Sequence, residues 1–430
     1  MTDKRESAAI DLAGVVEVPP ASETRHPDVR QPPERPLRLL VLLGLMAALG
    51  PASMDLYLPA LPTIADELGV SVSVTQLTIG SFLVGLGVGQ LVAGPMSDVL
   101  GRRRPLLVSI LVYVFATALC AAAPGIEVLV VSRLLQGVSA AAGVVIARAV
   151  VRDFYSGAEA ARYLSRLILI FGLAPVLAPS LGAAMLTVTS WRGLFGLLGV
   201  AALALLAAVA AWLPETLPRG QRRPGGVRAT AGSLRALIAD RSFVAYASAL
   251  GLATAAIVGY IAGAPFLLQE VHGVSPGVYG ALFGVNAVAM IVAAQVNAQI
   301  VERVGTGRML AIGVVLLVAS GALLTVVEVA GLGLVPTALA YLLTMTAWGL
   351  IPPNAIALGM AAHPEIAGAA SAMLGVFQYG LGGLAAPLAG LGGATSGLAS
   401  GLLILVCGLL AAVAFAAGQR WEASRRVVAG

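Results

Sequence analysis

The sequence carries very little charge for its length. Charged residues make up 11% of its 430 residues, less than half of the roughly 25% typical of a soluble domain. Apolar residues make up 59%, whereas disorder requires low hydrophobicity. A soluble fold is therefore excluded, and disorder is excluded everywhere except in the N-terminal tail. The basic pI of about 9.5 does not indicate nucleic acid binding, because no basic stripe on a soluble fold accompanies it. A membrane protein with several spans is the class that remains.

Cysteine and histidine are scarce as well. The two cysteines, Cys120 and Cys407, each lie in an apolar run, so they indicate no disulfide framework. The three histidines, His26, His272 and His363, stand far apart and lack metal-ligand spacing. The phosphate-binding pattern Gly-x-x-x-x-Gly-Lys is also missing. We therefore expect no metal site, no cofactor and no direct use of ATP.

Long apolar stretches are the main feature that the sequence does contain. A bilayer core requires about 20 apolar residues per helix, and twelve stretches of the chain meet that requirement. The sequence therefore predicts an all-α polytopic membrane protein with twelve transmembrane helices. The stretches run over about 39–61, 74–95, 105–123, 127–151, 163–187, 192–213, 243–268, 277–302, 308–329, 333–360, 367–391 and 396–418.

The stretches divide into two groups of six. The longest internal break, 214–242, holds several prolines, a Gly-Gly pair and several arginines, which is typical of a linker. An acidic residue, a glycine and an arginine stand at positions 98, 101 and 104, and the same types recur at 302, 305 and 308, an offset of 204 residues (302 − 98). Transporters built from two parallel repeats have this form, with the substrate path between the halves. We predict a disordered cytoplasmic tail (1–37), an N-terminal six-helix half (38–213), a cytoplasmic linker (214–242), a C-terminal six-helix half (243–418) and a cytoplasmic tail (419–430).

The placement of arginine predicts the orientation in the membrane. Short cytoplasmic loops are enriched in Lys and Arg. If the N-terminus lies inside, the arginines of the 102–104 loop, of the linker and of the C-terminal tail all lie inside too. The opposite side then receives mainly acidic residues and one arginine, Arg192. We therefore expect both termini to be cytoplasmic.

Asp55 is the sharpest chemical feature. It follows a long, largely apolar stretch of the first predicted helix. A carboxylate at membrane depth costs a few kcal/mol or more, so it usually faces a cavity or a partner and marks a pathway. Removal from water favours the protonated acid, which suits a proton carrier. The alternative is that the helix ends near Leu56 and that Asp55 is a solvated cap.

Arg133 is a basic residue of the fourth predicted helix, about one to two turns below its outer end. Gln136 and Gly137 follow it closely, which indicates a polar helix face directed to the interior. We favour a role in a cavity. The alternative is that Arg133 extends outward to the membrane surface.

Residues 94–104 form a tight, charged connection between the second and third predicted helices. Gly101 permits a turn conformation that other residues resist. Asp98 can pair with arginines or with a helix N-terminus, and such a latch would hold one conformation of a transporter. Simple anchoring by arginine is the alternative, but it accounts for neither Asp98 nor the glycines.

The fifth predicted helix contains two prolines four residues apart, Pro175 and Pro179, between Gly172 and Gly182. Proline removes a hydrogen bond from the helical ladder, and small residues allow close helix approach. The pattern predicts a kinked, tightly packed helix. The alternative is that the membrane environment merely tolerates the prolines.

Together these motifs resemble a known family. The chain looks like a major facilitator superfamily transporter, and more narrowly like the Bcr/CflA group of bacterial drug efflux proteins, over about residues 39–418. The segments that carry the resemblance are the loop motif 94–104, the helix-4 motif 133–137, the helix-5 antiporter motif 172–182 and, for the Bcr/CflA pattern specifically, 55–59, 152–153 and 213–216.

The resemblance implies the major facilitator fold and the exchange of a drug for protons across the bacterial cytoplasmic membrane. The implied partners are a small drug-like substrate, protons and membrane lipid, with no nucleic acid. The implied functional residues are Asp55, Tyr57, Arg133 and Gln136 for proton coupling and the substrate cavity; Gly94, Asp98, Gly101, Arg102 and Arg103 for the conformational latch; and Gly172, Pro175, Pro179 and Gly182 for the helix-5 motif.

One position departs from the family pattern. The family usually has a basic residue directly after the loop aspartate, where this chain has Val99. A charge network that uses this position is incomplete unless Arg103 or Arg104 substitutes. In the second half, Thr306 stands where Arg102 stands in the first.

Other functions stay open at this point. The same fold exports or takes up metabolites such as sugars or amino acids, and fold alone does not separate these from drugs. The few intramembrane charges favour a neutral or weakly charged amphiphile. A membrane enzyme would require a cluster of catalytic His, Asp or Glu at membrane depth, and only Asp55 qualifies, so we predict no enzyme. A sensor or scaffold would usually carry an added soluble domain, which we do not recognise.

Overall fold

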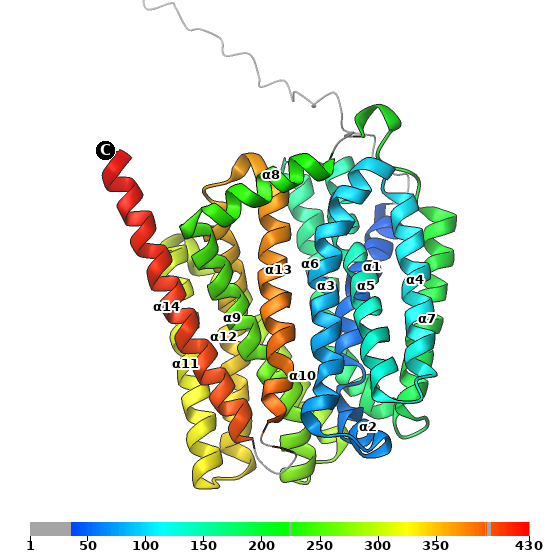
Figure 1. Cartoon of the computed structure of the whole chain (residues 1–430), viewed down its shortest axis with the longest axis vertical. Coiled ribbons are helices and arrows are strands. Elements are labelled where there is room, and N and C mark those ends of the chain that lie inside the picture. Colours follow the sequence, from blue (N-terminus) through cyan, green and yellow to red (C-terminus); the bar gives the residue numbers. More distant parts are fainter. Residues whose placement is uncertain (1–35, 156, 223–225, 392, 394–396, 430) are drawn as a thin grey trace, which may run out of the picture.

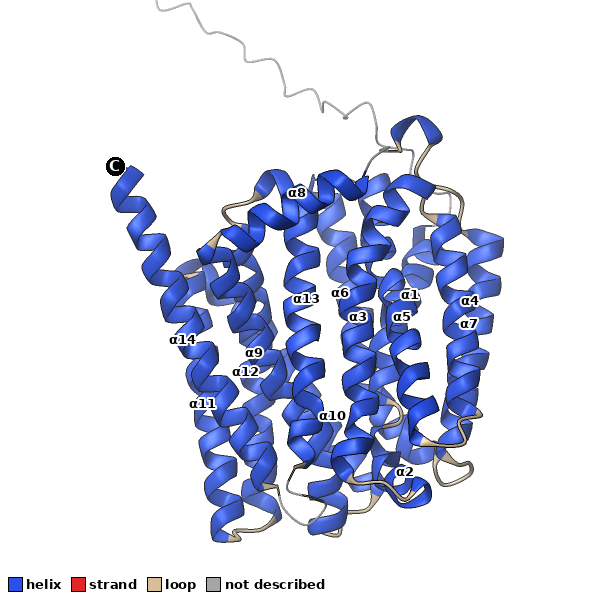
Figure 2. Ribbon diagram, viewed as in Figure 1, coloured by secondary structure: helices blue, strands red, loops and turns tan. Residues whose placement is uncertain are grey.

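The computed structural model describes residues 36–155, 157–222, 226–391, 393 and 397–429, and every regular element in these ranges is a helix (Figure 2). Within these ranges, eleven helices are long and apolar enough to cross a membrane. The fifth predicted span is α6, a helix of 29 residues whose stretch Leu173–Met185 is apolar. The predicted all-α, multi-span fold class is confirmed. The helices are α1 (Pro36–Asp55), α2 (Leu61–Leu68), α3 (Val72–Leu100), α4 (Arg103–Ala121), α5 (Ile126–Phe154), α6 (Gly157–Met185), α7 (Trp191–Trp212), α8 (Gly226–Ala239), α9 (Arg241–Phe266), α10 (Pro276–Val304), α11 (Thr306–Ala330), α12 (Leu334–Met360), α13 (Ala367–Ala385) and α14 (Leu398–Ala429).

The helices form two bundles that lie side by side (Figure 1). Helices α1 to α7 pack on one another, as do α9 to α14, and the bundles meet where α3 contacts α13 and α6 contacts α10. Helix α8 runs across one end of the molecule, whereas α2 lies at the opposite end (Figure 1). We call these two ends the α8 face and the α2 face.

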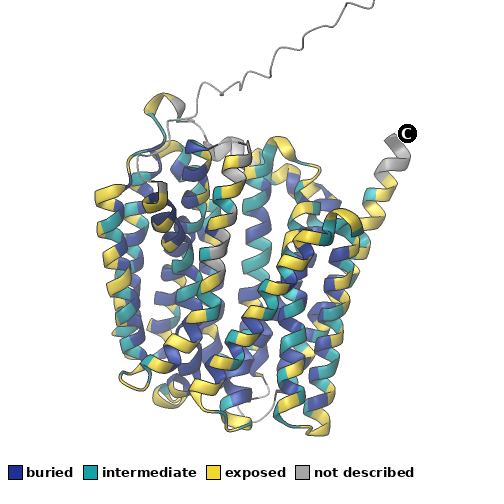
Figure 3. Ribbon diagram, turned by 180° about the vertical axis from the view of Figure 1, so that it is seen from behind, coloured by how far each residue is buried: buried dark blue, intermediate teal, exposed yellow. Residues whose placement is uncertain are grey.

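Apolar side chains cover the outside of the bundles. Val131 and Val200 are each 65% exposed, and exposed residues follow the outward sides of the helices (Figure 3). An apolar surface of this extent is far larger than the patches of soluble monomers. It is the surface that a bilayer core requires.

The repeated loop pattern has the same backbone form in both bundles. Gly101 joins α3 to α4 with φ of 91°, and Gly305 joins α10 to α11 with φ of 94°. A side chain resists this left-handed region, whereas glycine adopts it readily. The two loops are therefore tight for the same physical reason, 204 residues apart (305 − 101).

Three helical segments differ from the sequence-based expectation. The range expected as a linker contains α8, and α14 continues to Ala429 rather than ending near 418. Residues 419–423 are mostly good helix formers, which explains the extension. The first span, expected as one helix over 39–61, is interrupted: α1 ends at Asp55, a turn follows, and a 3-10 helix (Leu58–Ala60) leads into α2. Residues 1–35 of the predicted N-terminal tail (1–37) lie outside the described residues.

Candidate functional site

Asp55 lies at the interruption of the first span. Pro59 and Pro62 follow it closely, and a proline both lacks an N–H group and disfavours helical backbone at the residue before it. The regular helix therefore ends at Asp55, as the solvated-cap alternative assumes. The side chain is nevertheless buried, at 5% exposure. A helix end and a buried carboxylate thus coincide, and Asp55 is not a solvated cap.

Arg133, on α5, is completely buried. Its guanidinium lies against the rings of Tyr57 and Phe82, with Cζ 4.4 and 4.2 Å from the two ring centroids, an arrangement that the ring quadrupoles favour. Nη1 donates to the Ser53 carbonyl at 3.1 Å and to Gln136 Oε1 at 2.6 Å. Nη2 has no hydrogen-bond partner among the described residues. Arg133 therefore points inward and does not extend to the membrane surface.

Further hydrogen bonds fix the side chains around Arg133. Gln136 Nε2 donates to Thr117 Oγ1 at 2.7 Å, and Thr117 Oγ1 donates to the Tyr113 carbonyl at 2.7 Å. The hydroxyl groups of Tyr57 and Thr78 lie 3.0 Å apart. Such networks lock side-chain positions when every member is satisfied. Tyr57, Arg133 and Gln136 thus lie close together, but none of them lines the cavity described below, and their role in a substrate cavity stays a prediction.

Asp55 and Arg133 interact electrostatically without forming an ion pair within the described part of the chain. On its other side, Asp55 lies within electrostatic range of two phenols of the second bundle, Tyr260 on α9 and Tyr279 on α10. Asn286 Nδ2 donates to the Tyr260 hydroxyl at 3.1 Å. The carboxylate therefore lies near both a fixed cation of its own bundle and phenols of the other bundle.

The second-bundle side of the site is a cluster of buried aromatic rings. The ring centroid of Tyr260 lies 4.6 Å from that of Tyr341 and 5.4 Å from that of Phe283. The hydroxyls of Tyr279 and Tyr341 have no hydrogen-bond partner among the described residues. Sequence reasoning missed this cluster, because aromatic residues in apolar helices carry no distinguishing signal. Asn286, a polar residue within a predicted span, is the signal that was present.

Helix α6 approaches the interruption of the first span closely. A Cβ atom on Gly182 would collide with the Leu56 carbonyl oxygen, so only glycine fits there. Pro175 and Pro179 lie inside α6, which continues through both as one helix. The predicted tight packing is therefore present at Gly182, whereas the helix is not broken at the prolines. Gly172 lies on the same helix.

At the α8 face, the predicted latch residues form an ion-pair network within the first bundle. Arg102 Nη1 donates to Asp98 Oδ1 at 2.5 Å, and Arg102 Nε donates to Asp153 Oδ2 at 3.1 Å. Thr216 Oγ1 donates to the same Asp153 oxygen at 2.6 Å. The backbone N–H of Arg102 donates to Glu215 Oε1 at 2.7 Å. The loop is thereby tied to the end of α5 and to the segment after α7.

The environment of Arg102 keeps it charged. Burial alone would lower its pKa, but hydrogen bonds and charge from Asp153 and Asp98 outweigh burial and raise the pKa above its ordinary value. Arg103 Nη2 donates to the Ala210 carbonyl at 2.6 Å. Arg103 therefore does not substitute for the basic residue that the family usually has at the position of Val99. Gly94 lines the cavity described below.

Sequence reasoning did not predict that Asp153, Glu215 and Thr216 join the network of Arg102, although their segments carried the family resemblance. Asp153 and Glu215 lie 51 and 113 positions from Arg102 in the sequence. Thr216 lies 63 positions from Asp153, through which it joins the network. Pairing at such distances follows from helix packing and leaves no local pattern.

The bundles are joined at the α2 face. Hydrogen bonds and close backbone contacts connect them there. For example, a Cβ on Gly280 would lie only 3.0 Å from Ser180 Cα. The hydrogen bonds run from Gln76 Nε2 to the Ala262 carbonyl (2.8 Å), from Gln269 Nε2 to the Pro59 carbonyl (3.3 Å) and from Ser180 Oγ to the Gly280 carbonyl (3.1 Å).

Toward the α8 face the bundles enclose a cavity of about 480 Å³. Its walls come from α3, α5, α6, α8, the end of α12 and the first turns of α13. Its charged lining residues are Asp98, Arg102, Arg148, Arg152 and Glu365. This volume is in the range of small-molecule sites. The structure is thus closed at the α2 face and hollowed at the α8 face.

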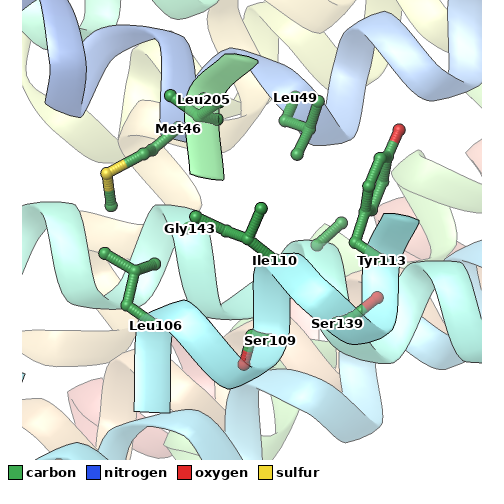
Figure 4. Close-up of a pocket in the computed structure, with 10 residues that line it drawn as sticks. Met46, Leu49, Leu106, Ser109, Ile110, Tyr113, Ser139, Gly143 and Leu205 are labelled. Atoms are coloured by element: carbon green, nitrogen blue, oxygen red, sulfur yellow. The ribbon is translucent and has the colours of Figure 1, made fainter. Parts of the chain in front are cut away.

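Two other pockets are separate from the site. An enclosed pocket beside Tyr113 and Ser139 (Figure 4) measures about 10 Å³, which is at the lower limit for one water molecule. The Tyr113 hydroxyl is hydrogen-bonded to Ser53.

The second is a groove of about 780 Å³ between α1 and α7. Its lining is apolar except for Arg38, whose Cζ lies 6.0 Å from the Trp212 ring centroid. It lies on the lipid-facing surface.

Most of this chain aligns with proteins of one known family. The profile of the Major Facilitator Superfamily matches residues 43–387. The uncharacterised MFS-type transporter YdgK of Bacillus subtilis (strain 168) is 36% identical over 88% of this chain and 94% of its own length. The chloramphenicol resistance protein of Pseudomonas aeruginosa is 34% identical over 68% of each chain, and the multidrug resistance protein D of Escherichia coli (strain K12) is 28% identical over 88% of this chain and 94% of its own.

Solved structures share the fold. A bacterial homologue of the human lysosomal transporter Spinster, in an inward-facing and unoccupied conformation, matches with a TM-score of 0.71 and 14% identity over 91% of this chain and 98% of its own. The profile and the named relatives agree with the Bcr/CflA resemblance of the motifs. The chain therefore belongs to the Major Facilitator Superfamily, within which its relatives include the multidrug and chloramphenicol resistance proteins.

Proposed function

We propose that this protein exports small, amphiphilic, drug-like molecules across the bacterial cytoplasmic membrane in exchange for protons. The α8 face lies in the cytoplasm and the α2 face outside. The names of the relatives, multidrug resistance protein D and chloramphenicol resistance protein, support the substrate class. The observation that carries proton coupling is the buried carboxylate of Asp55 beside, but not paired with, Arg133.

Asp55 has the environment that an exchange of protons requires. Burial favours the neutral acid, whereas the nearby positive charge of Arg133 favours the carboxylate. Because the two effects oppose each other, a small change in the distance between the groups changes proton occupancy. Asp55 also faces Tyr260 and Tyr279 of the other bundle, so movement of one bundle against the other changes its surroundings.

The cycle follows from these contacts. With the α2 face closed, a substrate enters the cavity from the cytoplasm and Asp55 releases its proton to that side. When the bundles rock, the α2 face opens, the substrate leaves and Asp55 takes a proton from outside. Asp98 pairs with Arg102 of its own bundle in this cytoplasm-open form and remains 48% exposed, so it is available to the second bundle when the α8 face closes.

Transport of a metabolite is the second candidate, because the same fold serves the xylose transporter XylE of E. coli, with a TM-score of 0.66 and 13% identity. Likeness at this identity concerns the fold alone. The cavity wall combines apolar side chains such as Leu91 and Ile366 with charged ones such as Arg148, and this combination favours an amphiphile.

Replacing Asp55 tests proton coupling. Asp55→Asn keeps the volume and hydrogen bonding of the side chain but cannot release a proton. In proteoliposomes with an acidic lumen, we expect its accumulation of chloramphenicol to fall at least about tenfold, to the level without a gradient. Equilibrium binding of chloramphenicol in detergent should persist, because binding of a neutral molecule needs no charge on residue 55.

Asp66→Asn is the matched control, because Asp66 is an exposed carboxylate of the same span; it should transport normally. Full gradient-driven accumulation by Asp55→Asn would mean that another group carries the proton, and Asp153 and Glu127 would be tested next.

A further inference from the structure

The cavity at the α8 face contains an arginine that the coupling site does not use. Arg148 lies on α5, six residues before its last residue, Phe154, which places it about 9 Å inside the helix end at 1.5 Å per residue. Its side chain is exposed and lines the cavity. A charged residue within a span usually faces a water-filled cavity and marks a pathway.

Arg148 has no counter-ion in the described part of the chain. No hydrogen bond or ion pair joins it to a described residue, whereas Arg102 on the same wall is paired with both Asp98 and Asp153. Arg152, one turn further along α5, also lines the cavity, is exposed and lacks an acidic partner among the described residues. Two neighbouring guanidinium groups therefore face the cavity without an ion-pair partner among the described residues. The acidic residues that line the same cavity are Asp98, which is paired with Arg102, and Glu365.

The remaining wall offers apolar side chains beside a few polar ones, among them Gln90 and Ser371. Leu91, Val145, Leu164 and Ile366 line the same cavity. On α13, the phenol of Tyr379 lies within electrostatic range of Arg148, although Tyr379 itself does not line the cavity. A ligand that binds both the guanidinium groups and the apolar side chains of this cavity has an apolar skeleton and one anionic group.

We propose that Arg148, assisted by Arg152, binds the anionic group of amphiphilic organic anions, and that such anions are among the substrates. This inference rests on the proposed export function. Guanidinium groups bind carboxylate, sulfonate and phosphate oxygens through parallel, charge-assisted hydrogen bonds. The cavity volume of about 480 Å³ accommodates a molecule of two or three fused or linked rings. The anionic head of a membrane lipid has the same chemistry, so the test must separate the two sources.

Two probes with one skeleton provide the test. 8-Anilinonaphthalene-1-sulfonate is anionic, and N-phenyl-1-naphthylamine is the same skeleton without the sulfonate. Their affinities are measured by equilibrium dialysis with the full-length protein in phosphatidylcholine nanodiscs, against empty nanodiscs. We expect Arg148→Gln to lower the ratio of sulfonate to neutral affinity about tenfold or more, as for loss of a hydrogen bond between charged groups. Arg148→Lys should restore part of the ratio.

Arg308→Gln is the matched control, because Arg308 is an exposed arginine near the same face that does not line the cavity; the ratio should not change. An unchanged ratio in Arg148→Gln overturns the proposal, as does an equal loss for both probes, which indicates a structural role. If phosphatidylglycerol co-purifies with the wild type but not with Arg148→Gln, while the probe ratio is unchanged, the site holds a lipid headgroup and the proposal is wrong.

Failure of this inference is distinguishable from failure of the proposed function. Gradient-driven accumulation of chloramphenicol by the wild type tests export and does not involve an anionic group. A protein that accumulates chloramphenicol but shows no dependence of the probe ratio on Arg148 is an exporter without an anion site.

Discussion

The chemistry at the level of single residues depends on how Arg133 is held. Its guanidinium is bonded to the Ser53 carbonyl and to Gln136, and it stacks on Tyr57 and Phe82. These neutral partners hold the buried cation without a carboxylate, while Nη2 has no hydrogen-bond partner among the described residues. Asp55 is therefore free of a permanent ion pair, which would otherwise hold it in its charged form.

Substitution of Arg133 separates its charge from its shape. Lysine retains the charge but not the planar group that stacks between rings and donates in two directions. We expect Arg133→Lys to lower gradient-driven transport about tenfold, because bonds from a charged donor contribute about 1.5–3 kcal/mol. Arg133→Ala should abolish transport and also lower the unfolding temperature in detergent, because it leaves a cavity and removes the donor to Gln136 Oε1. Equal transport by the lysine variant and the wild type would mean that charge alone suffices.

Part of the site could be predicted from single residues. Asp55 and Arg133 stood out because a charge within an apolar stretch is conspicuous, and Arg148 offered the same signal although we did not use it. The partners of Arg102 were different. Asp153 and Glu215 approach it only after α5 and α7 have packed on α4, so no local pattern revealed them.

At the scale of helices, the interruption of the first span was the least predictable feature. Apolar composition continues through residues 56–61 and therefore indicated one helix over 39–61. Two prolines end α1 at Asp55, and packing against α6 then buries the interrupted segment. Composition reports depth in the membrane, whereas the helix end depends on individual residues.

The close approach of α6 to this interruption gives a second prediction at this scale. A Cβ on Gly182 would overlap the Leu56 carbonyl oxygen, whereas a Cβ on Gly196 of α7 meets nothing within 4 Å. We expect Gly182→Ala to destabilise the protein by about 1–3 kcal/mol, as overpacking does, and to reduce transport by displacing Asp55. Gly196→Ala should be neutral or stabilising by up to about 1 kcal/mol. Thermal unfolding in detergent compares the two, and equal stability would mean that α6 can move aside.

For the whole molecule, the multi-span all-helical class followed from the sequence, but the closed and open ends did not. The class depends on apolar stretches of bilayer length, which each segment reveals alone. Which face is closed depends on contacts between distant segments, such as Gln76 with Ala262 and Ser180 with Gly280. Both conformations of a transporter use the same sequence, so the sequence cannot select one of them.

Orientation determines the direction of transport and gives the last prediction. The α8 face carries the arginines of the 102–104 loop and of the segment after α7, so we expect it in the cytoplasm. Gly220, near the α8 face, and Gly277, near the α2 face, are both exposed, and a Cβ on either meets nothing within 4 Å. Each is replaced by cysteine after Cys120 and Cys407, which are both buried, are changed to alanine. In spheroplasts, an impermeant maleimide should label Gly277→Cys at once and Gly220→Cys only after the membrane is permeabilised. The opposite pattern would place the cavity with Arg148 on the outer side, and the protein would then collect its substrates from outside rather than export them.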